Sequence, residues 1–380
     1  MSRKVAIAGV ALSDVGRVDD KNPYELIAQA SRRAVADAGL EKADIDGLGS
    51  TAISIMAPVD VGEYLGLTPR WLDSTSVGGS SWEIMAAHAV DAIAEGHADV
   101  ILLTYGSTAR ADMRRKLRGA SLDWGSRGPM QWEQPYGHTL ISKYAMAARR
   151  HMHEYGTTIE QLAQVAVSAR ANAALNTEAF VRDPITIDDV LDGPMIADPF
   201  TKLQCCIRSD GGAAVVLVAE DRAKDLAKAP VWVLGSGEAS THVSMSQWPD
   251  FTTGPAAIAG RMAFERAGVR PDEIDIAEVY DAFTYMLLIT MEDLGFCTKG
   301  EGGSFVEGGR LELGGALPTN TDGGGLSACH PGQRGLFLLV EAVKQLRGEC
   351  GPRQVPDAKL ACVSATGGWM CSSGTMILGR

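Results

Sequence analysis

The chain has 380 residues, of which 46% are hydrophobic and 22% are charged, and its formal net charge is -12. This length indicates two or three domain-sized units, and the ordinary balance of residue types argues against a disordered chain. A surface this acidic repels nucleic acid and anionic membranes, so neither is expected as a partner.

The N-terminal residues and the pattern of cysteines predict the compartment in which the protein resides. The first apolar run soon meets Asp14, which makes it too short for a signal peptide, and no later segment reaches the ~20 apolar residues of a membrane span. The seven cysteines are odd in number, irregularly spaced and without a CxxC pair. We therefore expect a cytoplasmic protein without a disulfide framework.

Strand and helix patterns alternate in the first part of the chain. Three segments favour strands: 4–10, 45–52 and 97–106. Two segments have helical spacing: 24–39 and 80–96. Gly39 is a natural C-cap of the first helix, and Ser80 with Glu83 has the spacing of a capping box at the start of the second.

The same rhythm returns after a polar stretch. Five later segments favour strands: 210–218, 230–240, 275–283, 359–368 and 375–379, the last two as a candidate hairpin. Two favour helices: 256–268 and 332–351. Both halves contain a helix rich in small residues, which suits close packing. We predict an α/β protein of two similar halves with one long insertion.

The segments divide the chain into three parts. The N-terminal half comprises 1–108 and 195–225, and the C-terminal half comprises 226–380. Residues 109–194 are rich in charges and prolines around two helical segments, which is typical of an inserted loop domain rather than of a core.

Three segments carry residues suited to chemistry. NTDGGGLSACHPGQRG, 320–335, places His330 at an expected strand-to-helix junction, where an imidazole can transfer protons near neutral pH. EVYDAFT, 278–284, ends a strand at Tyr280 and Asp281, and a tyrosine can donate to an oxyanion. SVGGSSWE, 76–83, has two glycines that permit close approach of a ligand. Each segment has a structural alternative, namely a loop histidine beside a proline, a structural tyrosine with a turn aspartate, and a tight loop.

Metal and nucleotide motifs are absent from the sequence. No His/Cys cluster has metal-ligand spacing, the two histidines of the HxH at 151–153 would diverge on a helix, and no GxGxxG lies at a strand–helix junction. Cys329, Cys362 and Cys371 could be nucleophiles, although cysteines on apolar segments are more often inert core residues. Ser80 and Ser81 have no identifiable base nearby in sequence.

Taken together, these segments resemble the thiolase superfamily, most closely the sterol-carrier-type thiolases and the steroid side-chain aldolases once called lipid-transfer proteins. The resemblance runs in order through VAIAGVALSDVG, AVDAIAEG, YAMAARRHMHEYGTTIEQLAQVAVSARANAALN, ITIDDVLDGPMIADPFTKLQCCIRSDGGAAVVLV, YDAF and NTDGGGLSACHPGQRG. It implies a thiolase-like, five-layered αβαβα fold of two pseudo-duplicated halves with an inserted loop domain. It also implies dimers or tetramers that bind CoA thioesters.

The departures from the thiolase pattern bear on the chemistry. The nucleophilic cysteine of thiolases falls on Gly79, which removes cysteine-dependent acyl transfer at this position. The histidine of the thiolase GHP motif falls on His330, whereas the steroid aldolases carry a second tyrosine there. Tyr280 stands where thiolases have Asn or His and where the steroid aldolases also have Tyr. The late acid/base cysteine of thiolases falls near Ser364, with Cys362 two residues earlier.

These features lead us to expect a CoA-thioester aldolase that cleaves a β-hydroxyacyl-CoA into a ketone or aldehyde and a shortened acyl-CoA. Tyr280 and His330 are the expected acid/base pair, and Asp281 is expected to orient one of them. The predicted substrate-binding residues are Gly79, Ser80, Gly367, Gly368 and His138. No metal is expected, and no cofactor beyond the CoA of the substrate.

Two other functions remain open. An acyl-CoA acyltransferase of the thiolase or Claisen type, or a subunit of such a complex, is disfavoured by Gly79. A non-catalytic lipid- or acyl-CoA-binding scaffold is disfavoured by the pairing of Tyr280 with His330. The expected partners are the acyl-CoA substrate, a second copy in a homodimer and, on the aldolase resemblance alone, a small OB-fold protein with a zinc ribbon.

Overall fold

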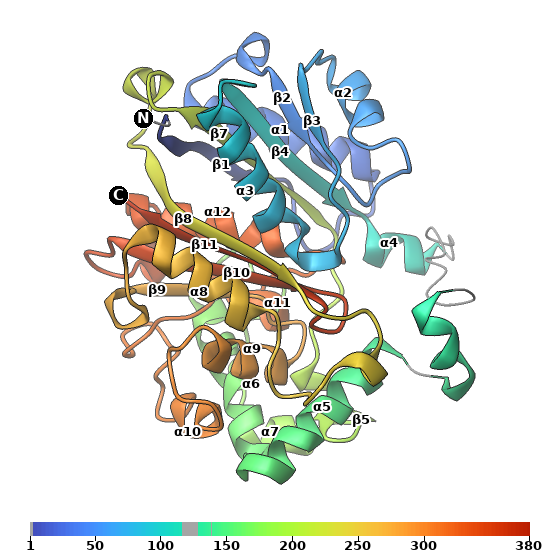
Figure 1. Ribbon diagram of the computed structural model, residues 1–380. Helices are drawn as coiled ribbons and strands as arrows, with labels where there is room; N and C mark the ends of the chain where they lie inside the picture. The colour runs from blue at the N-terminus through green and yellow to red at the C-terminus, as the bar shows by residue number, and fades with distance from the viewer. Residues whose placement is uncertain (1–2, 116–127, 138) are drawn as a thin grey trace.

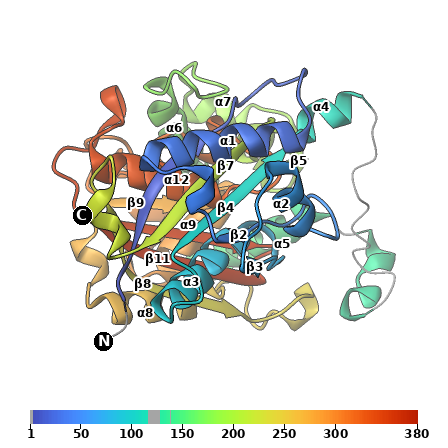
Figure 2. The same cartoon turned by 90° about the horizontal axis from the view of Figure 1, so that it is seen from above.

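The computed structural model describes residues 3–115, 128–137 and 139–380 and is shown in Figures 1 and 2. Its strands are β1 (Val5–Leu12), β2 (Gly47–Gly49), β3 (Trp71–Asp73), β4 (Val100–Ser107), β5 (Met195–Ala197), β6 (Phe200–Thr201), β7 (Gly211–Ala219), β8 (Val231–Ser240), β9 (Ile276–Val279), β10 (Leu360–Gly367) and β11 (Ser372–Gly379). Its α-helices are α1 (Pro23–Ala38), α2 (Val59–Leu65), α3 (Ser81–Ala94), α4 (Ala109–Arg114), α5 (Leu140–Tyr155), α6 (Ile159–Ala174), α7 (Ile187–Leu191), α8 (Ala256–Ala267), α9 (Thr284–Asp293), α10 (Gly302–Phe305), α11 (Gly324–Ser327) and α12 (Gly335–Arg347).

The main sheet has the strand order β3-β2-β4-β7-β1-β8-β11-β10-β9, which reveals the duplication. Each half of the sheet contains four strands in an equivalent order, counted outward from the centre: β1-β7-β4-β2 in one half and β8-β11-β10-β9 in the other. In both series the first two pairings are antiparallel and the third is parallel. The halves meet at β1 and β8 through only two residue pairs, Ala6–Trp232 and Ile7–Val231. The chain therefore has the α/β architecture of two similar halves that we predicted.

The helices complete five layers. α3 and α12 pack between the two halves of the sheet, α1 covers the outer face of the N-terminal half, and α8 covers the outer face of the C-terminal half (Figures 1 and 2). The expected inner faces of the central helices are all buried: Trp82, Met85, Ala86, Ala89 and Ile93 on α3, and Leu336, Leu339, Val340 and Val343 on α12. Helices with wide apolar surfaces suit a layer enclosed by two sheets. The predicted αβαβα arrangement is confirmed.

Equivalent glycines let the outer helices approach the sheet closely in both halves. A Cβ on Gly9 of β1 would lie 2.1 Å from the Ala34 carbonyl oxygen of α1, and a Cβ on Gly237 of β8 would lie 2.1 Å from the Ala259 carbonyl oxygen of α8. Any larger side chain would push its helix away. The small-residue helices are therefore tightly packed for the same physical reason in each half.

The insertion differs from its expected loop character. α5 and α6 bury apolar side chains such as Tyr144 and Leu162 in the main core, and α6 packs against α9 and α11 of the C-terminal half. The amphipathic spacing of α5 and α6 therefore predicts their burial better than the polar composition of the surrounding residues does. Residues 116–127 of this region lie outside the described part of the chain, and the proposed boundaries at 108, 195 and 226 remain a prediction.

Two local predictions were wrong. The Ser80–Glu83 capping box does not form, because Ser80 has helical rather than extended backbone angles and its hydroxyl pairs with Ser372 Oγ at 2.8 Å. The strand expected over 45–52 is limited to β2. Within the described residues, no helix combines the length and apolarity needed to cross a membrane.

Trp82 provides a test of the central layer. Its side chain is fully buried, and its indole N–H donates to Gln333 Oε1 at 3.0 Å. Trp82→Ala should lower the free energy of unfolding by about 3–5 kcal/mol because it leaves a large cavity. Urea denaturation followed by circular dichroism measures this change. Trp132→Ala, at a side chain that is 73% exposed, should change the same quantity by about 0.5 kcal/mol or less. Equal losses in the two variants would contradict this account of the core.

Candidate active site

The predicted site segments converge where the two halves meet around the start of α3. A Cβ placed on Gly79 would lie 2.4 Å from Tyr280 Cε2, and one placed on Gly78 would lie 2.8 Å from the Gly368 nitrogen. The rings of Tyr280 and His330 are 5.5 Å apart and nearly perpendicular. The structure thus gathers residues from four separate segments around one point.

Main-chain pairing at the end of β9 positions Tyr280. Its N–H donates to the Ser364 carbonyl oxygen at 3.0 Å, which extends the parallel pairing of β9 with β10 by one residue. The Asn320 side chain accepts from the Val279 N–H and donates to the Val279 carbonyl, both at 2.8 Å. The backbone just before Tyr280 is therefore held from both sides, which fixes the direction of the ring.

The ring of Tyr280 occupies the space beside Gly79. A Cβ at Gly79 would lie 2.4 Å and 2.6 Å from two ring carbons and 2.6 Å from the Thr366 carbonyl oxygen. No real Cβ tolerates such distances, so any side chain at position 79 would displace the ring or the β10–β11 turn. The packing of Tyr280 against the backbone therefore excludes a nucleophilic side chain at position 79.

Tyr280 is a neutral hydrogen-bond donor in this environment. Its side chain is buried, and its hydroxyl oxygen accepts the main-chain N–H of Arg334 at 3.2 Å. Burial raises the pKa of Tyr280 well above its usual value of 10. The phenol keeps its proton at neutral pH, so it can donate that proton but is a poor resting base.

His330 is a neutral base. Its main-chain N–H donates to Ser209 Oγ at 2.8 Å, which fixes the backbone at this point. Its buried Nε2 has no hydrogen-bond partner among the described residues. Burial, together with the positive charge of Arg334, lowers the pKa of His330 to about 4. The residue follows the short helix α11, not a strand as expected, because residues 324–327 turn before the chain reaches α12.

Asp281 acts on the His330 segment rather than on either ring. Its carboxylate accepts the main-chain N–H groups of Gly325 at 2.7 Å and Leu326 at 3.2 Å, at the start of α11. A Cβ on Gly325 would lie 3.0 Å from both Asp281 Oδ1 and His330 Cδ2. Burial raises the pKa of Asp281 to about 7, while Arg334 opposes the rise. Any orienting effect on His330 passes through this backbone.

The predicted substrate-binding residues have different surroundings. Gly367 ends β10 and Gly368 begins the turn to β11, both beside Gly78, and the Tyr144 hydroxyl holds this turn by donating to the Gly368 carbonyl at 3.0 Å. Ser80 is fully buried and directed to Ser372, so we withdraw it as a substrate contact. His138 lies outside the described residues.

The candidate nucleophiles are inert in this environment. Burial raises the pKa of the Cys329 and Cys371 thiols to about 11 in each case. Cys362 is fully buried within β10, and burial raises the pKa of its thiol as well. Ser364 Oγ pairs with Thr375 Oγ1 at 2.9 Å. None of the three thiols has the lowered pKa of an activated nucleophile.

Sequence reasoning missed three residues near the site. Arg334 is fully buried and contacts both the Tyr280 hydroxyl and the Cys329 carbonyl. Cys206 donates its N–H to the Ala282 carbonyl at 2.8 Å, and its thiol lies close enough that its charge would raise the pKa of Tyr280. Tyr144 holds the glycine turn. An arginine at the start of an apolar helix was the one signal in the sequence that could have been used.

The two histidines of the HxH do not share a metal site. His151 is buried and pairs with Glu292 at 3.0 Å, whereas His153 is exposed, so the two side chains diverge as predicted. In the described part of the chain, no group of three or more His, Cys, Asp and Glu side chains could hold a metal ion.

Known proteins are similar to this chain in sequence. Residues 237–380 match the family model described as thiolase C-terminal domain-like. The chain is 34% identical over 387 residues to an acetyl-CoA acetyltransferase from Methanothermobacter thermautotrophicus, covering all of both chains. It is 34% identical over 354 residues, and 90% of each chain, to a steroid side-chain-cleaving aldolase from Thermomonospora curvata.

A solved structure shows the same likeness in three dimensions. The chain superposes on the structure of an Ltp2-ChsH2(DUF35) aldolase with a TM-score of 0.89 and 31% identity, covering 99% of this chain and 98% of that one. Full-length identity above 30% and the shared five-layered fold lead to one conclusion. The chain belongs to the thiolase superfamily.

Proposed function

We propose that this protein is a CoA-thioester aldolase, which cleaves a β-hydroxyacyl-CoA into a ketone or aldehyde and a shortened acyl-CoA. The observation that carries the proposal is the contact between Tyr280 and Gly79, because the ring occupies the space that an acyl-accepting side chain would need. A reaction that forms no covalent acyl-enzyme fits this site. The relative and the solved structure that are named as aldolases support the same reaction.

A retro-aldol cleavage needs one proton removed and one delivered. The neutral His330 accepts the proton of the β-hydroxyl group at Nε2, the Cα–Cβ bond breaks, and its electron pair enters the thioester as an enolate. The neutral phenol of Tyr280 then protonates the α-carbon. The imidazolium returns its proton to the tyrosinate, so the enzyme is restored and no co-reactant is consumed.

Main-chain donors are well placed to stabilise the enolate. The N–H groups of Gly79 and of the Gly367-Gly368 turn lie at the start of α3, where the helix dipole favours negative charge. A preorganised donor of this kind contributes about 3 kcal/mol to transition-state stabilisation.

Two alternatives remain weaker. The acetyltransferase relative favours acyl transfer, but such a reaction would need a nucleophile other than position 79, and the nearby cysteine thiols have raised pKa values. A pure binding scaffold would leave the uncharged His330 and the buried Tyr280 without a role. Steroid side chains, branched fatty acyl chains and aromatic acyl groups all remain candidate substrates.

We also propose that the protein forms a homodimer through β3. This strand ends the main sheet, and Leu72 within it and Val77 after it are 46% and 38% exposed. Ile55, in the loop before α2, is fully exposed. An edge strand with apolar neighbours is suited to pairing with a second copy.

A partner protein and a cytoplasmic location complete the proposal. The solved relative is named as a pair, Ltp2 with ChsH2(DUF35), which supports our expectation of a partner protein; that this partner is a small OB-fold protein with a zinc ribbon remains part of the proposal. All seven cysteines are free thiols, which supports a reducing compartment. Size-exclusion chromatography with light scattering, with and without such a partner, checks both assemblies.

The function is tested with a panel of CoA esters. Purified protein, alone and with a neighbouring OB-fold protein, is incubated with steroid, branched and aromatic β-hydroxyacyl-CoA and β-ketoacyl-CoA esters. Mass spectrometry should show a free ketone or aldehyde and a shortened acyl-CoA without added CoA. Thiolysis that requires added CoA would overturn the aldolase proposal, and turnover of neither class would favour the scaffold.

Tyr280→Phe tests the proposed acid. The variant should lower kcat about 100-fold or more, because the proton for the α-carbon is lost while the ring remains in place. Calorimetry should show binding of the shortened acyl-CoA within about threefold of wild type. Tyr285→Phe is the matched control: Tyr285 is equally buried, but its hydroxyl donates to the Phe251 carbonyl. Equal activity losses in the two variants would rule out a specific role for Tyr280.

Gly79→Ala tests the steric argument. One methyl group at this position would press into the Tyr280 ring, so kcat should fall at least about tenfold although no polar group is lost. Gly96→Ala, at the other end of α3, meets no atom within 4 Å and should keep kcat, with some loss of stability because of its positive φ. Full activity in Gly79→Ala would show that the ring contact is unimportant.

A further inference from the structure

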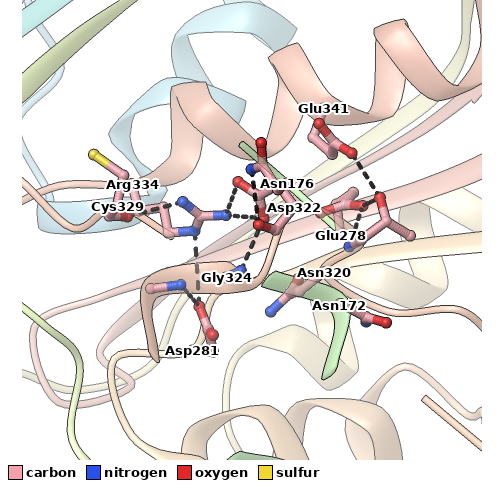
Figure 3. A network of polar contacts seen from close by, with 12 residues as sticks. Asn172, Asn176, Glu278, Asp281, Asn320, Asp322, Gly324, Cys329, Arg334 and Glu341 are labelled. Carbon is pink, nitrogen blue, oxygen red and sulfur yellow. Dashed lines mark hydrogen bonds and ion pairs between the residues drawn. The ribbon is translucent and has the colours of Figure 1, made fainter. Parts of the chain in front are cut away.

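Arg334 is a fully buried cation at the N-terminal end of α12. Figure 3 shows its guanidinium group between the Cys329 carbonyl, the Asp322 carboxylate and Asp281. Nη1 donates to the Cys329 carbonyl at 2.8 Å, and Nη2 donates to the two oxygens of Asp322 at 2.6 and 2.7 Å. Nε lies 3.8 Å from Asp281 Oδ1. Such a desolvated ion pair persists only where its geometry is well satisfied.

The same residue reaches both members of the proposed acid/base pair. Its main-chain N–H donates to the Tyr280 hydroxyl, and its side chain holds the carbonyl of Cys329, the residue directly before His330. Asp322 in turn accepts the main-chain N–H of Gly324 at 2.8 Å, at the start of the short helix that leads to His330. Arg334 therefore connects the Tyr280 side chain with the backbone of the His330 segment through hydrogen bonds.

Arg334 also dominates the charges around His330. Burial would lower the pKa of the guanidinium, but Asp322 and Asp281 outweigh this effect and the net pKa is raised, so Arg334 keeps its charge. His330 is surrounded by the positive charges of Arg334 and Arg208, by the Tyr280 ring and by Asp281 across Gly325. Of the charged groups, Arg334 has the largest effect on His330, after burial itself.

We propose that the Arg334–Asp322 ion pair is the positioning element of the acid/base pair. It fixes the phenol of Tyr280 through the Arg334 N–H, and it places a buried positive charge beside His330. The catalytic part of this inference rests on the proposed aldolase function, whereas its electrostatic part concerns the protein without substrate.

The chain offers a matched control for this ion pair. Arg353 donates to the two oxygens of Glu341 on α12 at 2.9 Å each, and both side chains are largely buried. This second pair contacts neither Tyr280 nor His330 in the described structure. Replacing both members of either pair by neutral amides avoids leaving the partner carboxylate charged and unpaired, although R334Q also removes the positive charge near Asp281.

The test compares R334Q/D322N with R353Q/E341Q by NMR titration of the His330 imidazole in substrate-free protein. The resonance is assigned by its loss in His330→Gln. In R334Q/D322N the pKa of His330 should rise by about one pH unit or more, because the charge of Arg334 lowers this pKa whereas Asp322, which is removed with it, is not among the groups that shift it. In R353Q/E341Q it should stay as in wild type. An unchanged titration in folded R334Q/D322N, or an equal rise in the control, would overturn the proposal.

A conservative variant separates the effect of the Arg334 charge from the effect of its hydrogen bonds. It also provides a test if the double variant does not fold. Arg334→Lys keeps the charge but loses the fork that binds Asp322 and Cys329 together. The titration of His330 should then stay close to that of wild type, whereas kcat for the ester cleaved by wild type should fall about tenfold or more with little change in KM. Wild-type-like kcat in this variant would refute the positioning role.

The two proposals can fail separately. If the wild type cleaves none of the CoA esters but the His330 pKa still rises in R334Q/D322N, the aldolase function is wrong and the electrostatic inference stands. If the wild type cleaves an ester but the pKa of His330 does not change in R334Q/D322N, the aldolase function stands and the electrostatic inference is wrong.

Discussion

The contact between the Tyr280 ring and the backbone at Gly79 is the constraint on which the rest of the site depends. The ring can lie there only because position 79 has no side chain. Its burial keeps the phenol protonated. The same contact therefore removes acyl transfer to a side chain at this position and, in the function that we propose, holds the proton donor of the aldol cleavage in place.

The duplicated fold brings these groups together. The two halves of the sheet enclose α3 and α12, so the N-terminal ends of helices from different halves meet near one point. Gly79 precedes the first of these helices and Arg334 precedes the second, while Tyr280 comes from a strand end of the C-terminal half. Tight packing of the outer helices on β1 and β8 keeps this central layer in place. The site is thus rigid because its residues sit at the ends of core elements.

Much of this could be predicted from the sequence, and the failures have physical reasons. Helical spacing correctly identified the buried faces of α3 and α12, because an enclosed helix must bury apolar side chains wherever it meets a sheet. The capping box at Ser80 was wrong because the chain enters α3 through a 3-10 turn, which spacing alone cannot reveal. The full contact set of Arg334 could not be predicted, because Asp281 comes from another segment and because the distance to Asp322, twelve residues earlier in the same segment, depends on how residues 323–333 fold. The orienting role of Asp281 stays a prediction, and its backbone partners Gly325 and Leu326 could not be foreseen because they too come from another segment.

The central claim is that turnover involves no covalent acyl-enzyme. The most direct measurement is intact-protein mass spectrometry of the wild type, quenched during turnover of the CoA ester that it cleaves. Our account predicts an unmodified chain mass while ketone or aldehyde accumulates, because neither Tyr280 nor His330 receives an acyl group. A mass increase equal to the acyl group, located on Cys206, Cys371 or any other side chain and formed as fast as product, would contradict it.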